Sequence, residues 1–193
     1  LPIQSKNAEG KSDMIFVDEG IRYDASLEAL AGLKSVTEGG VITAGNASQI
    51  TDGAAAVVIC NDAGLKKIQA NPRAEIVSIS VVGDDPVFML TGPIPASIKA
   101  LKTANLTIDD MDLYEVNEAF APVPLAWAED LKADKLKLNV NGGAMALGHP
   151  LGATGAKLMT TLLHEMERRE STYGLQAICE GGGTANATII KRL

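Results

Sequence analysis

Aromatic residues make up only 4% of the 193 residues, and the chain has two cysteines and two histidines. Two cysteines, Cys60 and Cys179, cannot form a disulfide framework, so we expect a reducing compartment and a cytoplasmic location. No apolar run approaches the length of a membrane span, which predicts that the chain has none. HExxH, GxxxxGK[ST] and GxGxxG are all missing, and we therefore expect no metal site and no nucleotide-binding loop.

Grouped positive charge is also missing, because the 17 Lys and Arg residues are scattered among 24 Asp and Glu residues. The formal net charge of −7 argues against a nucleic-acid partner, which would require a basic surface. An anionic small molecule stays possible, since backbone N–H groups can bind it. Hydrophobic residues at 46% are sufficient for a buried core.

Strand and helix patterns alternate along most of the chain, which predicts a layered α/β fold. A short amphipathic stretch covers 26–34, and a helix at 154–168 is expected from Met159, Leu162, Leu163 and Met166 at spacings of three and four. The other expected elements are strands at 53–60, 74–82, 112–116 and 138–141, helices at 62–70, 93–104 and 118–132, and a closing antiparallel pair at 175–180 and 184–191.

His149 and Cys179 are the strongest candidates for chemistry, because each stands beside glycines near the end of an expected strand. A neutral imidazole at His149 could take a proton from a thiol or stabilise an oxyanion; alternatively it only hydrogen-bonds its neighbours. The thiol of Cys179 could act as acid or base next to three glycine N–H groups, or be a small buried hydrophobe. By contrast, we expect Cys60 to be buried and inert, and His164 to be exposed to solvent.

Asn117 follows an expected strand and precedes an expected helix. On local grounds it is the N-cap of that helix, with Glu118 as a first-turn acid. Its alternative role is to hold a water molecule or to donate toward a carbonyl oxygen.

Four segments together resemble the thiolase family: 43–55 (TAGNASQITDGAA), 117–121 (NEAFA), 139–155 (NVNGGAMALGHPLGATG) and 179–183 (CEGGG). They occur in the family order, and the resemblance extends over essentially the whole chain. It implies a thiolase-type layered αβαβα fold with a mixed sheet, represented here by its C-terminal half. It also implies acyl transfer between coenzyme A thioesters, as thiolysis of a 3-ketoacyl-CoA or as the reverse Claisen condensation.

The resemblance also implies roles for individual residues. His149 would activate a nucleophilic cysteine, and Cys179 would exchange a proton with the α-carbon of the second thioester or with the incoming thiol. Asn117 would hold a water that forms one oxyanion hole with His149, and the Gly181 N–H would help form the other. The residues expected to contact coenzyme A are Ser48, Ala119 and Phe120.

The same resemblance predicts the organisation of the chain. Residues 1–44 would be a remnant of the coenzyme A-binding loop domain, residues 45–72 the last strand and helix of the N-terminal domain, and residues 73–193 the C-terminal domain. The expected partners are coenzyme A and acyl-CoA as substrates, with no permanently bound cofactor, and further copies in a homodimer or homotetramer.

Two features depart from the family pattern. Neither Cys60 nor Cys179 matches the family's nucleophilic cysteine, so we expect a missing N-terminal half or a partner chain to supply it, and this chain alone to be inactive. Glu180 places a carboxylate next to Cys179, where it would raise the pKa of the thiol if it pointed into the site. The alternative function is a non-catalytic subunit that binds acyl-CoA or lipid, and a biosynthetic direction of the reaction also stays open.

Overall fold

A computed structural model describes residues 2–7 and 9–193, which divide into two compact units with the boundary between Leu33 and Lys34. The first unit holds an antiparallel hairpin of β1 (Ile3–Lys6) and β2 (Ser12–Ile15) and the short helix α1 (Leu27–Ala31). Ser26 caps this helix by accepting a hydrogen bond from the N–H of Ala29. The helix lies within the amphipathic stretch expected at 26–34, but none of its residues is buried.

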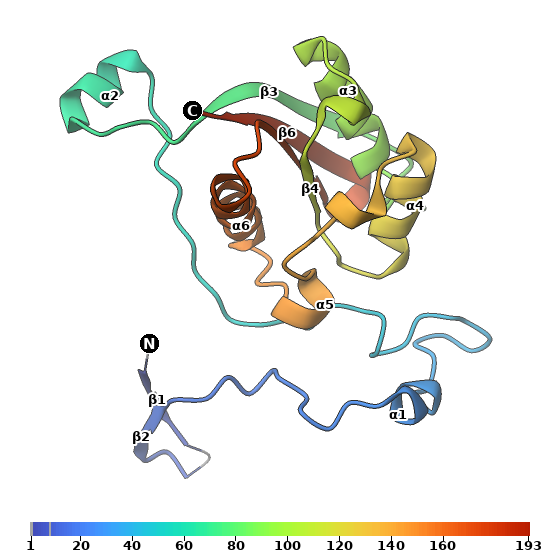
Figure 1. The fold of residues 1–193 in the computed structure, drawn as a ribbon. Coiled ribbons are helices and arrows are strands. Elements are labelled where there is room, and N and C mark those ends of the chain that lie inside the picture. Colours follow the sequence, from blue (N-terminus) through green and yellow to red (C-terminus); the bar gives the residue numbers. More distant parts are fainter. Residues whose placement is uncertain (1, 8) are drawn as a thin grey trace. The chain divides into compact units, whose positions relative to one another are not determined.

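The second unit is built around a four-stranded mixed sheet (Figure 1). Its strands are β3 (Ala74–Gly83), β4 (Leu113–Val116), β5 (Tyr173–Cys179) and β6 (Thr184–Arg192), in the order β3-β6-β5-β4. The β4–β5 pair is parallel, whereas β6 runs antiparallel to both of its neighbours. The expected strands at 74–82, 112–116, 175–180 and 184–191 are therefore confirmed.

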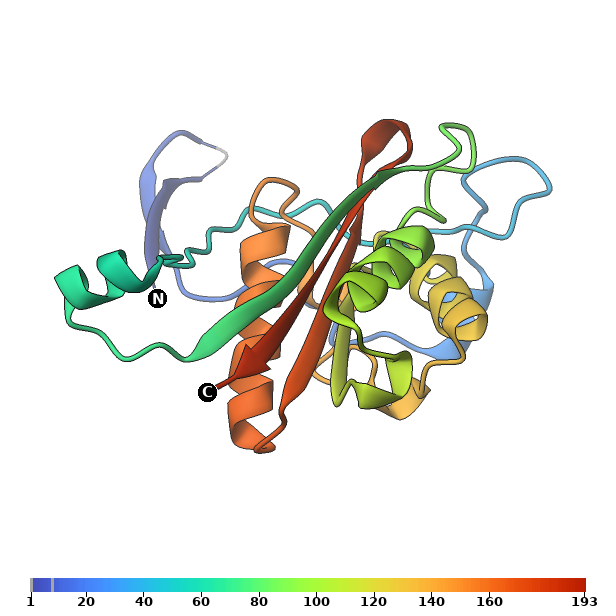
Figure 2. The same cartoon turned by 90° about the horizontal axis from the view of Figure 1, so that it is seen from above.

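Helices cover both faces of this sheet, as Figure 2 shows. One face is covered by α3 (Pro93–Ala104) and α4 (Pro122–Leu131), and the other by α6 (Thr154–Arg168). The remaining helical elements of this unit are α2 (Asp62–Ile68), α5 (Ala144–Leu147) and the 3-10 turns η1 (Ile108–Asp110), η2 (Lys135–Lys137) and η3 (Gly181–Gly183). The α/β class expected from the sequence is confirmed. Among the described residues, none of the helices has the length and apolar character needed to span a bilayer.

Trp127 is the centre of the larger core, between the sheet and helices α3 and α4. Its ring is fully buried, meets Tyr114 edge to face at 5.2 Å between ring centroids, and donates from Nε1 to Ser97 Oγ at 2.8 Å. The smaller core lies under α6, where Leu162 and Met166 pack on the opposite face of the sheet. The stripe predicted for this helix therefore does face the core.

The strand expected at 53–60 is wrong, because these residues are extended, exposed and form no ladder with any described strand. Cys60 is accordingly exposed and not buried. An apolar run shows only that burial would be favourable, and a strand forms only where a neighbouring edge can pair with it.

The prediction of a strand at 138–141 is also wrong. Only Leu138 pairs with the sheet, through a single bridge to Tyr114. Asn139 takes the place of a strand at the free edge of β4. Its side-chain amide donates to the carbonyl of Val116 and accepts from the same residue's N–H, both at 2.9 Å. With φ at 46°, Asn139 turns the chain away from the sheet instead of continuing along it.

Candidate active site

His149 lies in the loop between α5 and α6. The residue before it, Gly148, has a backbone conformation that other residues rarely adopt. Gly148 has φ 80° and ψ 161°, and a Cβ there would lie 2.5 Å from Oγ1 of Thr51. The N–H of His149 donates to the carbonyl of Gln49 at 2.8 Å. The segment that contains Gln49 and Thr51 therefore fixes the main chain on which the imidazole is mounted.

A hydrogen-bond chain determines which ring nitrogen of His149 carries its proton. Nδ1 lies 2.6 Å from Oγ1 of Thr154, and that hydroxyl donates its only proton to the carbonyl of Pro150 at 3.0 Å. This arrangement favours Oγ1 as the acceptor for Nδ1–H. The favoured neutral ring carries its proton on Nδ1 and its lone pair on Nε2.

Asn117 completes this arrangement on the other side of the ring. Its side chain is fully buried, and Nδ2 lies 3.2 Å from Nε2 of His149, to which it donates. Its N–H continues the sheet by donating to the carbonyl of Ala177 at 2.9 Å. The expectation that Asn117 is a helix N-cap is wrong, because α4 begins only at Pro122. Two prolines close to that start restrict where a helix can begin.

Glu118 contacts α5 and does not lie in the first turn of α4, where it was expected. Its Oε2 accepts from the N–H of Met145 at 3.0 Å, in the first turn of α5. A Cβ on Gly143 would lie 2.2 Å from that carboxylate, so the side chain is packed directly against the glycine-rich loop. The carboxylate thus holds the loop that leads to His149 and is not a first-turn acid of α4.

The surroundings of His149 favour the neutral ring. Burial lowers its pKa from the ordinary value of 6.5, and the positive charge of Lys157 lowers it further. A neutral imidazole with a lone pair on Nε2 is a general base at pH 7.

Cys179 is the last residue of β5 and is half-buried against the core under α3 and α4, together with Phe120. Burial raises the pKa of its thiol above the ordinary value, and the charge of Glu180 adds a smaller increase. Glu180 itself is exposed and accepts a hydrogen bond from the side-chain amide of Asn186. The thiol is therefore protonated at neutral pH.

The turn after Cys179 needs glycine at its end more than at its start. Gly183 has φ 83°, and a Cβ there would lie 2.7 Å from the carbonyl oxygen of Asp84. Gly181, the residue expected to supply an oxyanion N–H, is exposed and has open space around the position of a Cβ. The sharp turn leaves the start of this glycine run open to a ligand.

The three residues expected to contact coenzyme A lie together. The N–H of Ser48 donates to the carbonyl of Ala119 at 2.9 Å, and Ala47 forms an antiparallel bridge with Phe120. The next residue along the chain, Gln49, holds the N–H of His149. One short segment thus joins the expected binding residues to the imidazole.

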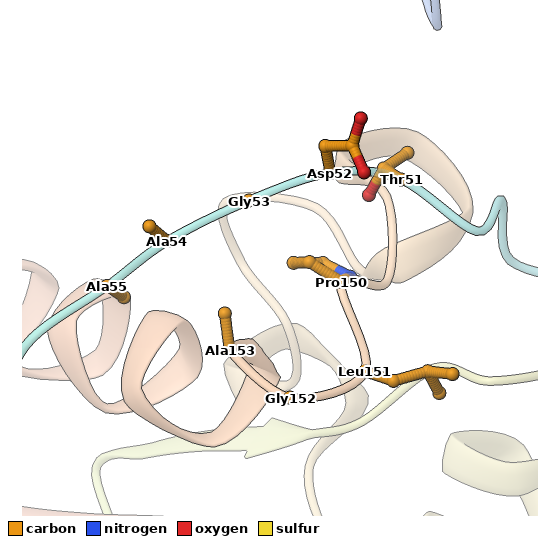
Figure 3. Close-up of a pocket in the computed structure, with 9 residues that line it drawn as sticks. All are labelled: Thr51, Asp52, Gly53, Ala54, Ala55, Pro150, Leu151, Gly152 and Ala153. Carbon is orange, nitrogen blue, oxygen red and sulfur yellow. The ribbon is translucent and has the colours of Figure 1, made fainter.

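A groove lies on the other side of this segment, between residues 51–55 and residues 150–153 (Figure 3). Gly53 runs directly beside Pro150, since a Cβ on Gly53 would lie 2.8 Å from Cγ of the proline. This close approach requires a residue without a side chain at position 53. The groove borders the residue after His149 and is open to solvent.

The structure brings Asn117 and His149 into contact and places Ser48 beside Ala119, whereas no contact joins Cys179 to the imidazole. His164 is exposed, as expected. Two contributors were not anticipated from the sequence: Thr154, which binds Nδ1, and Lys157, which acts on the imidazole through its charge. A threonine and a lysine in the first turn of a helix give no local signal of such a role.

Comparisons with known proteins agree with this architecture. The family model described as "Thiolase, C-terminal domain" matches residues 70–192, and the one described as "Thiolase, N-terminal domain" matches residues 1–63. The chain therefore belongs to the thiolase family, and its layered α/β fold is that of thiolases.

Relatives of known name include the steroid 3-ketoacyl-CoA thiolase FadA6 of Mycobacterium tuberculosis (strain ATCC 25618 / H37Rv), which is 58% identical over 96% of this chain and 45% of its own length. The acetyl-CoA acetyltransferase of Cupriavidus necator is 44% identical over 100% of this chain and 49% of its own. The crystal structure of human mitochondrial 3-ketoacyl-CoA thiolase matches with a TM-score of 0.87 and 45% identity, over 100% of this chain and 49% of its own. A second structure of that human enzyme is a complex with CoA. The chain spans about half the length of the relatives it matches.

Proposed function

We propose that this chain provides the proton-transfer groups and part of the coenzyme A site of a thiolase that cleaves 3-ketoacyl-CoA into acetyl-CoA and a shortened acyl-CoA. The observation that carries this proposal is the hydrogen-bond chain through His149, in which Thr154 holds the proton on Nδ1 and Asn117 donates to Nε2. The 58% identity to a steroid 3-ketoacyl-CoA thiolase favours the degradative direction and a fatty acid or steroid side chain as the acyl group.

In the proposed reaction, Nε2 of His149 removes the proton from a nucleophilic cysteine supplied by sequence outside these 193 residues. The thiolate attacks the 3-keto carbon, and the bond between C2 and C3 then breaks with its electron pair passing to C2. The thiol of Cys179, kept protonated by burial, delivers its proton to C2 and releases acetyl-CoA. Free coenzyme A then gives its thiol proton to the Cys179 thiolate and attacks the acyl-enzyme. The bond between the acyl group and the nucleophilic cysteine breaks, coenzyme A keeps the shortened acyl chain, and the released cysteine thiolate regains its proton from His149.

Negative charge develops on two carbonyl oxygens in this sequence. Asn117, through a bound water and together with His149, would stabilise one of them, and the exposed N–H of Gly181 would stabilise the other. Ser48, Ala119 and Phe120, which lie together beside the His149 loop, would contact coenzyme A. No permanently bound cofactor is required by these steps.

The organisation that we propose follows the same family. Residues 1–44 belong to the coenzyme A-binding loop domain, residues 45–72 to the N-terminal domain and residues 73–193 to the C-terminal domain. The enzyme acts as a homodimer or homotetramer in the cytoplasm. This chain by itself is expected to be inactive, because neither Cys60 nor Cys179 matches the family's nucleophilic cysteine.

The first test uses the two histidines of the chain as a matched pair. In the complete assembly, with the nucleophilic cysteine present, His149→Ala should abolish release of acetyl-CoA from a 3-ketoacyl-CoA and coenzyme A. His164→Ala should leave it unchanged, because His164 is exposed on α6. Unchanged turnover in the His149 variant would refute the catalytic assignment.

The two cysteines offer a second matched pair. Cys179→Ser should slow carbon–carbon bond cleavage by about 100- to 10,000-fold, the usual range for a general acid or base, while Cys60→Ser should have no effect. Transfer of an acyl group onto the enzyme from a simple acyl-CoA should survive in the Cys179 variant. Tight binding of acyl-CoA without any turnover by the wild-type assembly would instead favour a non-catalytic binding subunit.

A further inference from the structure

Lys157, in the first turn of α6, reaches back to the loop that carries His149. Its Nζ donates to the carbonyl oxygen of Leu147 at 3.1 Å and to that of Gly148 at 2.8 Å. These are the two residues immediately before His149, at the end of α5. The ammonium group therefore binds carbonyls that a helix end leaves without partners inside the helix.

These contacts matter because the loop is held in a conformation that it would not adopt on its own. Gly148 is at φ 80° and ψ 161°, a region that is essentially restricted to glycine. Gln49 fixes the loop from one side through the N–H of His149, and Lys157 fixes it from the other through two carbonyls. The direction of the imidazole depends on both attachments.

Glu115 is a buried carboxyl group that interacts electrostatically with Lys157. It lies on β4, two residues before Asn117, with only 1% of its surface exposed, and its Oε2 has no hydrogen-bond partner among the described residues. Burial raises the pKa of this carboxyl to about 8, and the charge of Lys157 opposes that rise. In return, Glu115 offsets the effect of burial on Lys157, whose pKa is lowered. With a pKa of about 8, the Glu115 carboxyl is largely protonated at pH 7 and becomes a full counter-charge to Lys157 only at higher pH.

We propose that Lys157 is a positioning residue of the active site, which holds the His149 loop through its two carbonyl contacts and opposes protonation of the imidazole through its charge. This inference rests on the proposed role of His149 as the base. The other ionisable groups close to the pair are Glu118, after β4, and Glu165 on α6, both acidic. Lys157 is thus the cation whose charge opposes protonation of the ring.

The direction of the expected effect follows from the charges. Replacing Lys157 with Met removes a positive charge near His149, so protonation of the ring becomes easier and the pKa of His149 rises toward its ordinary value. The base is then protonated at a higher pH, and the acid limb of the rate profile moves to higher pH. Loss of the two carbonyl contacts should lower kcat by about tenfold or more, because small errors in the placement of a catalytic group are costly.

The test combines activity with a direct measurement on the ring. In the complete assembly, Lys157→Met should lower kcat with a smaller change in KM and shift the acid limb, and Lys157→Arg should restore both in part. The matched control is Lys137→Met, because Lys137 is also half-buried and donates to a backbone carbonyl, that of Met111 at 2.9 Å, far from the His149 loop. The control should change neither property.

The ring measurement separates this inference from the proposed function. In protein labelled at histidine, the His149 signal should titrate at higher pH in Lys157→Met than in the wild type, and His164→Gln identifies which of the two signals it is. An inactive wild-type assembly would refute the thiolase proposal, while the titration would still report on Lys157. An unchanged titration midpoint in folded Lys157→Met, with kcat also unchanged, would overturn the inference.

Discussion

Replacing Thr154 with Val is the sharpest test of the hydrogen-bond chain through His149. Valine has nearly the shape of threonine, and the site is 97% buried, so packing is kept while the hydroxyl is lost. The carbonyl of Pro150 retains two donors, the N–H groups of Ala153 and Thr154 at 2.7 and 2.9 Å. The loss therefore falls on Nδ1–H of His149, which no longer has an acceptor.

The expected loss in rate follows from the loss of this one hydrogen bond, between Nδ1–H of His149 and the hydroxyl of residue 154. A net hydrogen bond of about 1–1.5 kcal/mol biases the ring toward the tautomer with its proton on Nδ1, and its loss allows up to about a tenfold redistribution toward Nε2–H. Since only the Nε2 lone pair can act as the base, kcat for thiolysis should fall by up to about tenfold. The buried, unpaired N–H should also cost about 1–3 kcal/mol of unfolding free energy.

Two variants serve as controls for this experiment. Thr154→Ser keeps the hydroxyl and should retain the rate, whereas Thr160→Val removes a hydroxyl that donates only to the carbonyl of Ala156, at 2.8 Å in the same helix. Nitrogen-15 shifts of the His149 ring should change in Thr154→Val and in neither control. If the ring shifts and kcat of Thr154→Val equalled those of the wild type, the assignment of the tautomer would be wrong.

Three further outcomes follow from buried groups elsewhere in the chain. Ser97→Ala leaves the buried indole N–H of Trp127 without an acceptor and should cost about 1–3 kcal/mol in urea unfolding; an unchanged midpoint would contradict the core described above. Iodoacetamide should modify the exposed Cys60 before Cys179 at pH 7, and mass spectrometry should detect modification of Cys179 mainly at alkaline pH, since its pKa is raised. The pKa of Glu165 is lowered to about 2, chiefly by its hydrogen bond from Arg168, so its stabilising effect is present above about pH 5 and is lost as pH falls toward 2. Glu165→Gln should therefore lower the melting temperature at pH 7 and change it little near pH 2.

Sequence patterns predicted the helices and strands well where the local pattern alone determines the packing. Helix α6 has one apolar stripe and one polar face, so its periodicity alone is sufficient, and β5 and β6 are connected too briefly to pair in any other way than antiparallel. Residues 53–60 show the opposite case. Their apolar character says nothing about whether an unpaired edge is available, and pairing is a property of the whole molecule.

The sequence predicted which residues belong to the candidate site better than it predicted which of them contact one another. Glycines beside His149 and Cys179 mark places where the backbone bends sharply, and both residues do lie at such bends. The contact between Asn117 and His149 joins positions 32 residues apart, and it exists only because the glycine-rich loop returns to the end of β4. Local reasoning made Asn117 a helix cap, since the residue before a helix is the commonest place for an asparagine.

The parallel pairing of β4 and β5 also determines which way the site residues face. Leu113 pairs with Gly174, so Leu113, Glu115 and Asn117 share one face of the sheet with Gly174 and Gln176. Side chains alternate between the two faces along β5, and Cys179 is three residues after Gln176. Its side chain therefore points to the other face, where it packs with the core.

The imidazole and the thiol therefore approach the end of the sheet from opposite faces. A substrate that meets both must lie across the ends of the strands, beside the exposed residues Gly181 and Gly182 of the turn after Cys179. This arrangement suits a reaction in which one carbon receives a nucleophile while its neighbour receives a proton. The two groups then act on adjacent atoms without transferring a proton directly to each other.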